Sequence, residues 1–199
     1  MTSGRYQLRG PEELDAEQRS LHNRIISGPR QSQKSQAPLT DESGALLGPF
    51  ALMTISPAIG DAVQQVGAAL RFSSGLTPLV REATILLVAA RHRCDFEWIS
   101  HAGLGRSAGL DEDALAALGR GHVPHGLSAE DAYALQTTRT LLVDGALRDE
   151  DYHRATTRLG ERTLAELVWL CGYYSMLALA LTVFDPPLAV ADDVAPWRG

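Results

Sequence analysis

Cysteine is scarce in this 199-residue chain, which contains only Cys94 and Cys171. Two cysteines so far apart are too few for a disulfide scaffold, and no CxxC pair is present to bind zinc or to act as a dithiol. Residues 1–18 are polar and lack the apolar run of a secretory signal peptide. We therefore expect a reduced, cytoplasmic protein.

Positive charge is also in short supply, because 18 Lys and Arg residues stand against 24 Asp and Glu residues, for a formal net charge of −6. A protein that neutralises nucleic-acid phosphates normally has the opposite balance, so no nucleic-acid partner is expected. Aromatic residues make up only 6% of the chain, but a hydrophobic fraction of 45% is enough for a core. This composition excludes wholesale disorder and fits one domain with terminal extensions.

Signals for β-strands are few, whereas signals for helix starts and stops recur along the chain. Ser56-Pro57 and Thr77-Pro78 each combine an N-cap residue with proline at the first helical position, and Ser128 resembles the start of a capping box. Asp95 is the expected cap of the helix that begins at Phe96. Apolar residues at helical spacing follow these starts. The sequence predicts an all-α fold with helices over 11–27, 57–70, 78–93, 96–108, 110–118, 129–144, 149–160 and 164–184.

The segment from Leu164 to Phe184 is apolar and long enough to raise the question of a membrane helix. It contains Glu166 and Ser175, and Asp185 follows it directly. We therefore expect no membrane association. The segment is interpreted as a helix buried on nearly all sides, either in the domain core or in a subunit interface.

Three side chains near the middle of the sequence are candidates for chemistry. Glu97 and His101 are four residues apart, so on a helix they lie on one face. Glu82 lies on an otherwise apolar face, where a carboxylate needs a partner or a changed pKa. If their two helices pack as a hairpin, Glu82 reaches His101 inside a secluded hollow. Such a cluster can shuttle a proton or bind a divalent cation, or it can consist of ordinary structural pairs with Arg81 or Arg93.

Cys94 stands at the start of the second helix of this predicted hairpin. The helix dipole, together with Arg91 and Arg93, would stabilise its thiolate and make it reactive. The alternative is a buried, inert thiol, as most unpaired cysteines are.

Four further residues are candidates for binding a small-molecule substrate. Trp98 could stack on a planar substrate, and Tyr173 or Tyr174 could donate a hydrogen bond to its carbonyl or carboxylate. Arg71 could bind its anionic group. Packing in the core, or a salt bridge at a helix end in the case of Arg71, explains each of them without a substrate. No metal ligands and no cofactor are assigned.

Several separated blocks of sequence point to a known family. The spacing from Glu82 to Cys94 to His101 occurs together with the blocks LLGPFALMTISP, REATILLVA, CDFEWISH, AGLDEDALAAL and LVWLCGYYSML, in that order. With these blocks the chain resembles the carboxymuconolactone decarboxylase / alkyl hydroperoxidase D-like superfamily, in a subgroup with CxxEWxxH in place of CxxC…H. The resemblance implies an alkyl hydroperoxidase D-like helical domain over residues 46–185 that forms a homo-oligomer, a trimer or hexamer. An N-terminal helix and flexible linker (1–45) would precede it, and an irregular tail (186–199) would follow.

The resemblance also implies a choice between two chemistries. The hydroperoxidase branch uses a cysteine pair, and here Glu97 occupies the position of the second cysteine. The decarboxylase branch needs no cofactor and acts on a small lactone acid. We therefore expect a cofactor-independent acid/base enzyme in which His101, oriented by Glu97 and Glu82, moves protons on a small organic acid or lactone by decarboxylation, isomerisation or elimination. The alternatives are a peroxiredoxin-like thiol peroxidase acting through Cys94 and a metal-dependent or non-catalytic binding protein.

Overall fold

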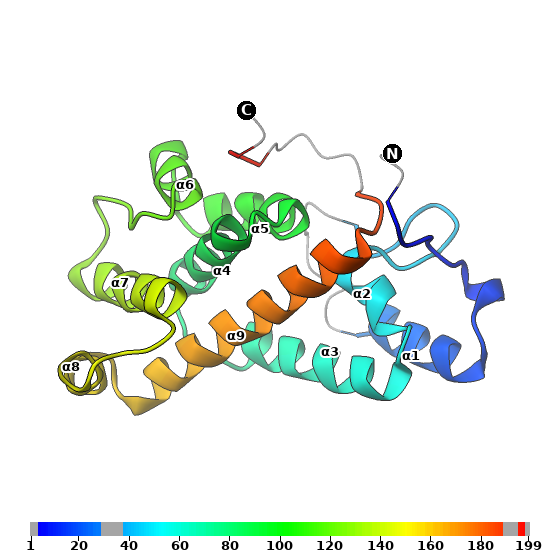
Figure 1. Ribbon diagram of the computed structural model, residues 1–199, viewed down its shortest axis with the longest axis horizontal. Coiled ribbons are helices and arrows are strands. Elements are labelled where there is room, and N and C mark those ends of the chain that lie inside the picture. The colour runs from blue at the N-terminus through cyan, green and yellow to red at the C-terminus, as the bar shows by residue number, and fades with distance from the viewer. Residues whose placement is uncertain (1–3, 29–37, 189–194, 198–199) are drawn as a thin grey trace.

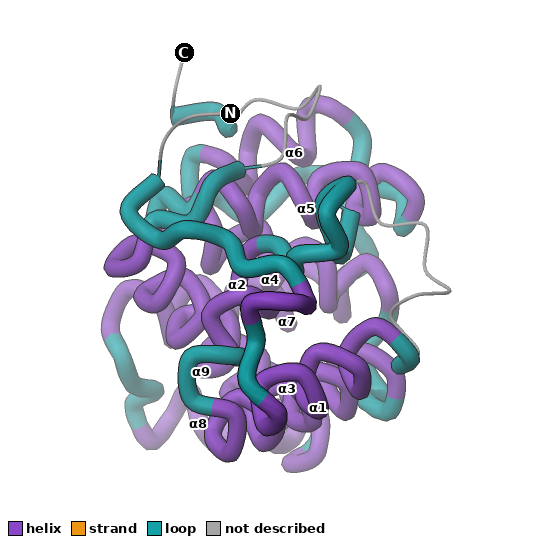
Figure 2. Tube along the Cα trace, turned by 90° about the vertical axis from the view of Figure 1, so that its right-hand side faces the viewer, coloured by secondary structure: helices purple, strands orange, loops and turns teal. Residues whose placement is uncertain are grey.

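The computed structural model describes residues 4–28, 38–188 and 195–197. Its described residues form helices and loops without a β-strand (Figure 2), which confirms the predicted all-α class. The elements are a short 3-10 helix (Pro11–Glu13), α1 (Ala16–Ile26), α2 (Gly48–Met53), α3 (Pro57–Phe72), α4 (Pro78–His92), α5 (Asp95–Ser107), α6 (Glu112–Gly119), α7 (Ala129–Asp144), α8 (Asp149–Leu159) and α9 (Glu161–Phe184).

Two of the predicted helix caps form as expected. Thr77 Oγ1 accepts a hydrogen bond from the backbone N–H of Val80 at 3.2 Å, at the start of α4. Ser128 Oγ accepts from the N–H of Asp131 at 3.1 Å and donates to the Asp131 carboxylate at 2.7 Å, at the start of α7. Each cap satisfies a backbone donor that the first turn leaves without an internal partner.

The prediction for the start of α5 was wrong by one residue. Cys94 is the N-cap of α5, without a capping hydrogen bond from its side chain, and Asp95 is the first helical residue. There the Asp95 carboxylate still lies at the positive end of the helix dipole. It accepts a hydrogen bond of 2.6 Å from the indole N–H of Trp197.

Helix α9 runs diagonally across the whole molecule (Figure 1) and contacts α2, α3, α4, α7 and α8. The face that it turns inward packs on α4, where Ile85, Leu86 and Val88 are fully buried. By length and composition α9 could cross a membrane, but 44% of its most apolar window is buried inside the protein. It is therefore the central packing element of the helical fold.

The outward face of α9 is apolar too. The exposed residues Trp169, Met176, Leu179 and Val183, which we call the α9 stripe, repeat at helical spacing along it. Trp169 is 66% exposed and Leu179 is 64% exposed. The sequence predicted that this helix is buried on nearly all sides. In a single copy of the chain only its inward face is buried.

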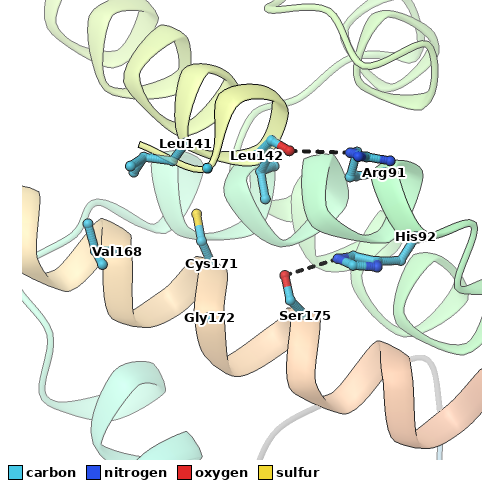
Figure 3. Close-up of a pocket in the computed structure, with 9 residues that line it drawn as sticks. Arg91, His92, Leu141, Leu142, Val168, Cys171, Gly172 and Ser175 are labelled. Atoms are coloured by element: carbon cyan, nitrogen blue, oxygen red, sulfur yellow. Dashed lines mark hydrogen bonds between the residues drawn. The ribbon is translucent and has the colours of Figure 1, made fainter. Parts of the chain in front are cut away.

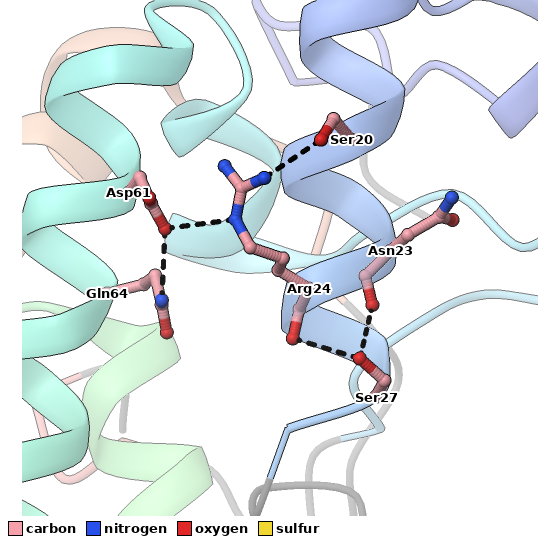
Figure 4. A network of polar contacts seen from close by, with 6 residues as sticks. All are labelled: Ser20, Asn23, Arg24, Ser27, Asp61 and Gln64. Atoms are coloured by element: carbon pink, nitrogen blue, oxygen red, sulfur yellow. Dashed lines mark hydrogen bonds and ion pairs between the residues drawn. The ribbon is translucent and has the colours of Figure 1, made fainter.

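The N-terminal helix packs onto the same core. Leu21 and Ile25 of α1 lie in the main hydrophobic cluster. At the surface Arg24 Nε contacts Asp61 of α3 at 3.3 Å (Figure 4). The linker expected over residues 28–37 lies outside the described residues apart from Gly28, and the tail expected over 186–199 is described only at 186–188 and 195–197.

Two helical glycines give a test of this packing. A Cβ at Gly60 of α3 would overlap the backbone carbonyl of Met53 at the end of α2, whereas a Cβ at Gly172 of α9 would meet nothing. We expect Gly60→Ala to lower the free energy of unfolding by about 1–3 kcal/mol because of overpacking. Gly172→Ala should raise it by up to about 1 kcal/mol, because alanine is the better helix former. Urea unfolding of both variants measures this, and a Gly60→Ala protein as stable as the parent would contradict the α2–α3 contact.

Candidate active site

The α4–α5 hairpin brings Glu82 and His101 together in the protein interior. Glu82 lies on α4 and His101 on α5, and the two helices pack against each other. His101 Nδ1 and Glu82 Oε2 are 2.7 Å apart. The two residues are only 5% and 2% exposed. The structure thus forms the contact across the hairpin that the sequence left conditional.

The other oxygen of Glu82 and the other nitrogen of His101 also have charged neighbours. Arg81 Nε donates to Glu82 Oε1 at 3.2 Å. Glu97 Oε2 lies 3.5 Å from His101 Nε2, one helical turn away on α5. The Glu82 carboxylate therefore makes both contacts that the sequence offered as alternatives, one with His101 and one, the structural bridge, with Arg81. Arg93 takes no part in this bridge.

Electrostatics sets the protonation of this pair. Burial raises the pKa of Glu82, but the hydrogen bond and charge of His101, with Arg71 and Arg81, offset it and hold the pKa at about 2. Burial lowers the pKa of His101, assisted by the charges of Arg71 and Arg81 and opposed by Glu82. The ground state is thus a carboxylate facing a neutral imidazole.

The hydrogen bond to Glu82 fixes the tautomer of that imidazole. An ionised carboxylate only accepts hydrogen bonds, so the proton in the 2.7 Å contact is on Nδ1 of His101. The lone pair of the neutral ring is therefore on Nε2. A carboxylate behind Nδ1 orients the ring and stabilises the imidazolium that forms when Nε2 takes up a proton.

Tyr174 completes the cluster from α9. The Tyr174 ring meets the His101 ring edge-on at 5.2 Å between centroids. On its other contact, the Tyr174 ring meets the Tyr173 ring at the same separation. Burial and the charge of Glu97 raise the pKa of the Tyr174 phenol, which stays protonated. Its hydroxyl makes no hydrogen bond to the residues that the structure describes. A phenolic donor is thus present beside the imidazole.

Arg71 lies at the end of α3 and is half-buried. Its positive charge lowers the pKa of Glu82, His101 and Tyr174 alike, which places it next to the cluster. That Arg71 binds a substrate anion stays a prediction.

Cys94 has the opposite character from the reactive thiolate considered above. The residue is 5% exposed, and burial together with the carboxylates of Glu97 and Asp95 raises the pKa of its thiol to about 12. The prediction that the helix start and nearby arginines would stabilise a thiolate is therefore corrected. Burial, together with the two acidic residues in the first turn of α5, outweighs the effect of the dipole on this thiol.

Trp98 lies in the hydrophobic core and is 5% exposed. Its ring meets Trp197 edge-on at 5.4 Å between centroids. Among the described residues, Trp98 therefore packs against Trp197 and the hydrophobic core, as a packing residue does. The structure thus brings Glu82, Glu97, His101, Tyr174 and Arg71 together, with Tyr173 behind Tyr174, and leaves Trp98 in the core.

The cavities found among the described residues lie elsewhere. One of about 340 Å³ opens between α4, α7 and α9 (Figure 3), and one of about 530 Å³ lies beside the C-terminal end of α4. A third, of about 10 Å³, lies near Tyr6. His101 lines none of the three, because Glu82, Glu97 and Tyr174 pack around its ring. None of these three cavities is the hollow that the sequence analysis expected beside the His101 imidazole.

Metal-binding geometry is not found in the described part of the chain either. No group of three or more His, Cys, Asp or Glu side chains there is arranged to hold an ion. In particular, His101 Nδ1 is hydrogen-bonded to Glu82, and His101 Nε2 lies 3.5 Å from Glu97 Oε2. The alternative of a metal-dependent protein thus gains no support from this cluster.

Sequence reasoning missed two features of the structure. Ser100, next to His101 on α5, has a buried hydroxyl without a hydrogen-bond partner among the described residues. No pattern in the sequence could have revealed that. His92 Nε2 lies 3.0 Å from Ser175 Oγ at the mouth of the smaller of the two large cavities (Figure 3). The sequence could not predict this contact, because His92 and Ser175 are far apart in the sequence and meet only through the packing of α4 against α9.

Comparisons with known proteins agree with this architecture. Residues 57–140, which contain Glu82, Glu97 and His101, match the model of the Carboxymuconolactone decarboxylase family. A search of the curated proteins found no match. Among solved structures the chain is similar to an "alkylhydroperoxidase AhpD core", an uncharacterized peroxidase-related protein from Ralstonia eutropha JMP134. The TM-score is 0.69 at 11% identity, covering 94% of this chain and 92% of that one, so the likeness shows the fold alone. The family match over residues 57–140 and the shared helical fold thus agree with the resemblance to the carboxymuconolactone decarboxylase / alkyl hydroperoxidase D-like superfamily that the sequence indicates.

Proposed function

We propose that this protein is a cofactor-independent acid/base enzyme that acts on a small organic acid or lactone. The observation that carries the proposal is the buried 2.7 Å hydrogen bond between Glu82 and His101. It combines an ionised carboxylate with a neutral imidazole whose Nε2 is basic. A pair of this kind, held rigidly by two packed helices, is suited to moving a proton.

Each neighbouring group has a part in the proposed reaction. His101 Nε2 accepts a proton from the substrate, and Glu82 stabilises the resulting imidazolium. Arg71 attracts the substrate carboxylate, and the Tyr174 hydroxyl donates a hydrogen bond to the oxygen on which negative charge develops. In a decarboxylation, the carboxyl group of the substrate gives its proton to His101 Nε2 and leaves as CO2. The electron pair of the broken C–C bond moves into the conjugated carbonyl and gives an enolate, which takes that proton back from His101 and restores the neutral imidazole. Isomerisation or elimination would use the same groups.

The proposal requires substrate to reach a residue that is only 5% exposed. Tyr174 covers His101 from α9, with Tyr173 packed behind it, so α9 must shift or the Tyr174 side chain must rotate for Nε2 to meet a substrate. Such lid-like motions are common in enzymes that exclude water from the reacting groups.

Catalysis by His101 is tested with 4-carboxymuconolactone and a panel of small β-keto and lactone acids. We expect His101→Ala to lower kcat/KM by about 10²- to 10⁴-fold, the usual contribution of a general acid/base. His153→Ala, at an exposed histidine of α8, should change nothing. Circular dichroism checks that both variants keep the helical fold. Turnover that survives in His101→Ala, or no turnover of any compound by the parent, would contradict the proposal.

The pH profile of the same reaction reports on the charges around His101. Because burial lowers the pKa of His101, the acidic limb of kcat/KM should lie below the usual histidine range near pH 6.5. Glu82→Gln removes the group that raises this pKa and should move the limb to lower pH. Arg71→Gln removes a group that lowers it and should move the limb to higher pH. NMR titration of the His101 ring measures the same shifts without substrate, and two shifts in one direction would refute this electrostatic account.

A thiol peroxidase acting through Cys94 is the second candidate, because the structural neighbour is described as peroxidase-related. With a pKa of about 12, only about one Cys94 thiol in 10⁵ is ionised at pH 7. We expect peroxide treatment to leave Cys94 as unmodified as Cys171, whose thiol pKa burial also raises to about 12. Mass spectrometry after trapping of sulfenic acid measures this. Oxidation of Cys94 together with peroxide consumption that Cys94→Ser abolishes would favour the peroxidase instead.

We also infer that the α9 stripe is covered by further copies of this chain, as trimers or hexamers. Large exposed apolar side chains in a row usually mark an interaction surface. We expect light scattering with size-exclusion chromatography to find an oligomer that Leu179→Glu dissociates. Tyr152→Glu, at an exposed aromatic residue of α8, should leave it intact. A monomeric parent protein, or an oligomer insensitive to Leu179→Glu, would refute the assignment.

A further inference from the structure

We propose that a second site, remote from His101, binds a phosphate-bearing small molecule with a planar ring. The site is the cavity of about 530 Å³ beside the C-terminal end of α4. Arg91, Arg93, Arg120 and Arg139 line it together with Trp197, and we call it the arginine pocket. Its volume is within the usual range for small-ligand sites.

The charge of this pocket is unusual for the chain. Four arginines line it and no acidic residue does, although the protein has a net charge of −6. Within the described ranges none of the four forms an ion pair with a carboxylate. Like charges that share a cavity repel one another, so the cluster disfavours folding until an anion neutralises it. A phosphate group matches the planar fork of arginine donors well.

Two of the arginines are held in place by the backbone. Arg91 Nε donates to the carbonyl of Leu142 at 3.3 Å, and Arg139 Nε donates to the carbonyl of Gly121 at 3.1 Å. These bonds use one N–H of each guanidinium and leave the terminal nitrogens for a ligand. Side chains that are already oriented lose less entropy when an anion binds.

The backbone at Arg93 gives a second, independent indication. Arg93 has φ +50° and ψ +44°, the left-handed conformation that normally selects glycine at the end of a helix. Its guanidinium carries no hydrogen bond or ion pair among the described residues. A strained arginine without a structural partner, facing a cavity with three other arginines, indicates a ligand-binding role.

Trp197 accounts for the planar part of the ligand. Its indole N–H donates to Asp95 at 2.6 Å, and its ring meets Trp98 edge-on. The ring is thus fixed on α5 while one part of it lines the pocket. A fixed indole offers a surface on which a purine-like ring can stack, next to the arginines that would take the phosphate.

The experiment uses AMP as a probe for ring and phosphate, pyrophosphate for phosphate alone, and citrate for other anions. Calorimetric titration at constant ionic strength measures the affinity of each. We expect the parent protein to bind AMP and pyrophosphate more tightly than citrate. Arg93→Gly and Arg120→Gln should each weaken both phosphate probes at least tenfold. Arg154→Gln, at an exposed arginine of α8, is the charge-matched control and should bind like the parent.

Two readouts separate binding from a structural role. Arg93→Gly relieves the left-handed strain, so its thermal midpoint should rise or stay equal while its affinity for phosphate falls. Trp197→Ala should weaken AMP but leave pyrophosphate unchanged. No binding of AMP or pyrophosphate by the parent, equal binding of citrate, or equal losses in Arg154→Gln and Arg93→Gly would overturn the proposal. Turnover at His101 is not needed for any of these measurements.

Discussion

The hydrogen bond between Glu82 and His101 is the contact on which the candidate site depends, and three helices, α4, α5 and α9, hold it in place. It joins α4 to α5 across a turn of two residues, Arg93 and Cys94. Removing one partner of a buried, charged pair leaves the other unsatisfied at a cost of about 3–5 kcal/mol. Such a pair persists only where the surrounding helices hold it in place. Here α9 provides that support, because Tyr174 packs directly on the imidazole.

The fold could be read from the sequence because its signals are local. Proline after a capping residue, as at Thr77-Pro78, places a helix start without knowledge of tertiary structure. The contact of Glu82 with His101 was also predictable, because a hairpin of two adjacent helices leaves few other arrangements. The start of α5 was misplaced by one residue, since Asp95 and Cys94 both precede an amphipathic run and only the backbone decides which one is the cap.

Properties that depend on long-range packing could not be read in this way. The sequence left open whether Cys94 is an activated thiol or a buried, inert one, because its pKa is set by burial and by Glu97, which only the folded helix brings near. The grouping of Arg120 and Arg139 with Arg91 and Arg93 needs α6 and α7 to pack against the end of α4. The apolar run in α9 hides two different faces, because hydrophobicity alone does not tell a core from an interface.

The backbone N–H of Tyr6 donates to the carbonyl of Phe184 at 2.9 Å, one of the carbonyls in the last turn of α9 that have no N–H donor within the helix. A segment that precedes α1 is thus joined to the end of α9, which lies far along the sequence from it. Because α9 also contacts α2, α3, α4, α7 and α8, the core stays open until that helix has left the exit tunnel. The helical core is therefore expected to close only after α9 has been synthesised, and nascent chains that stop before α9 would expose the apolar side of α4 to chaperones.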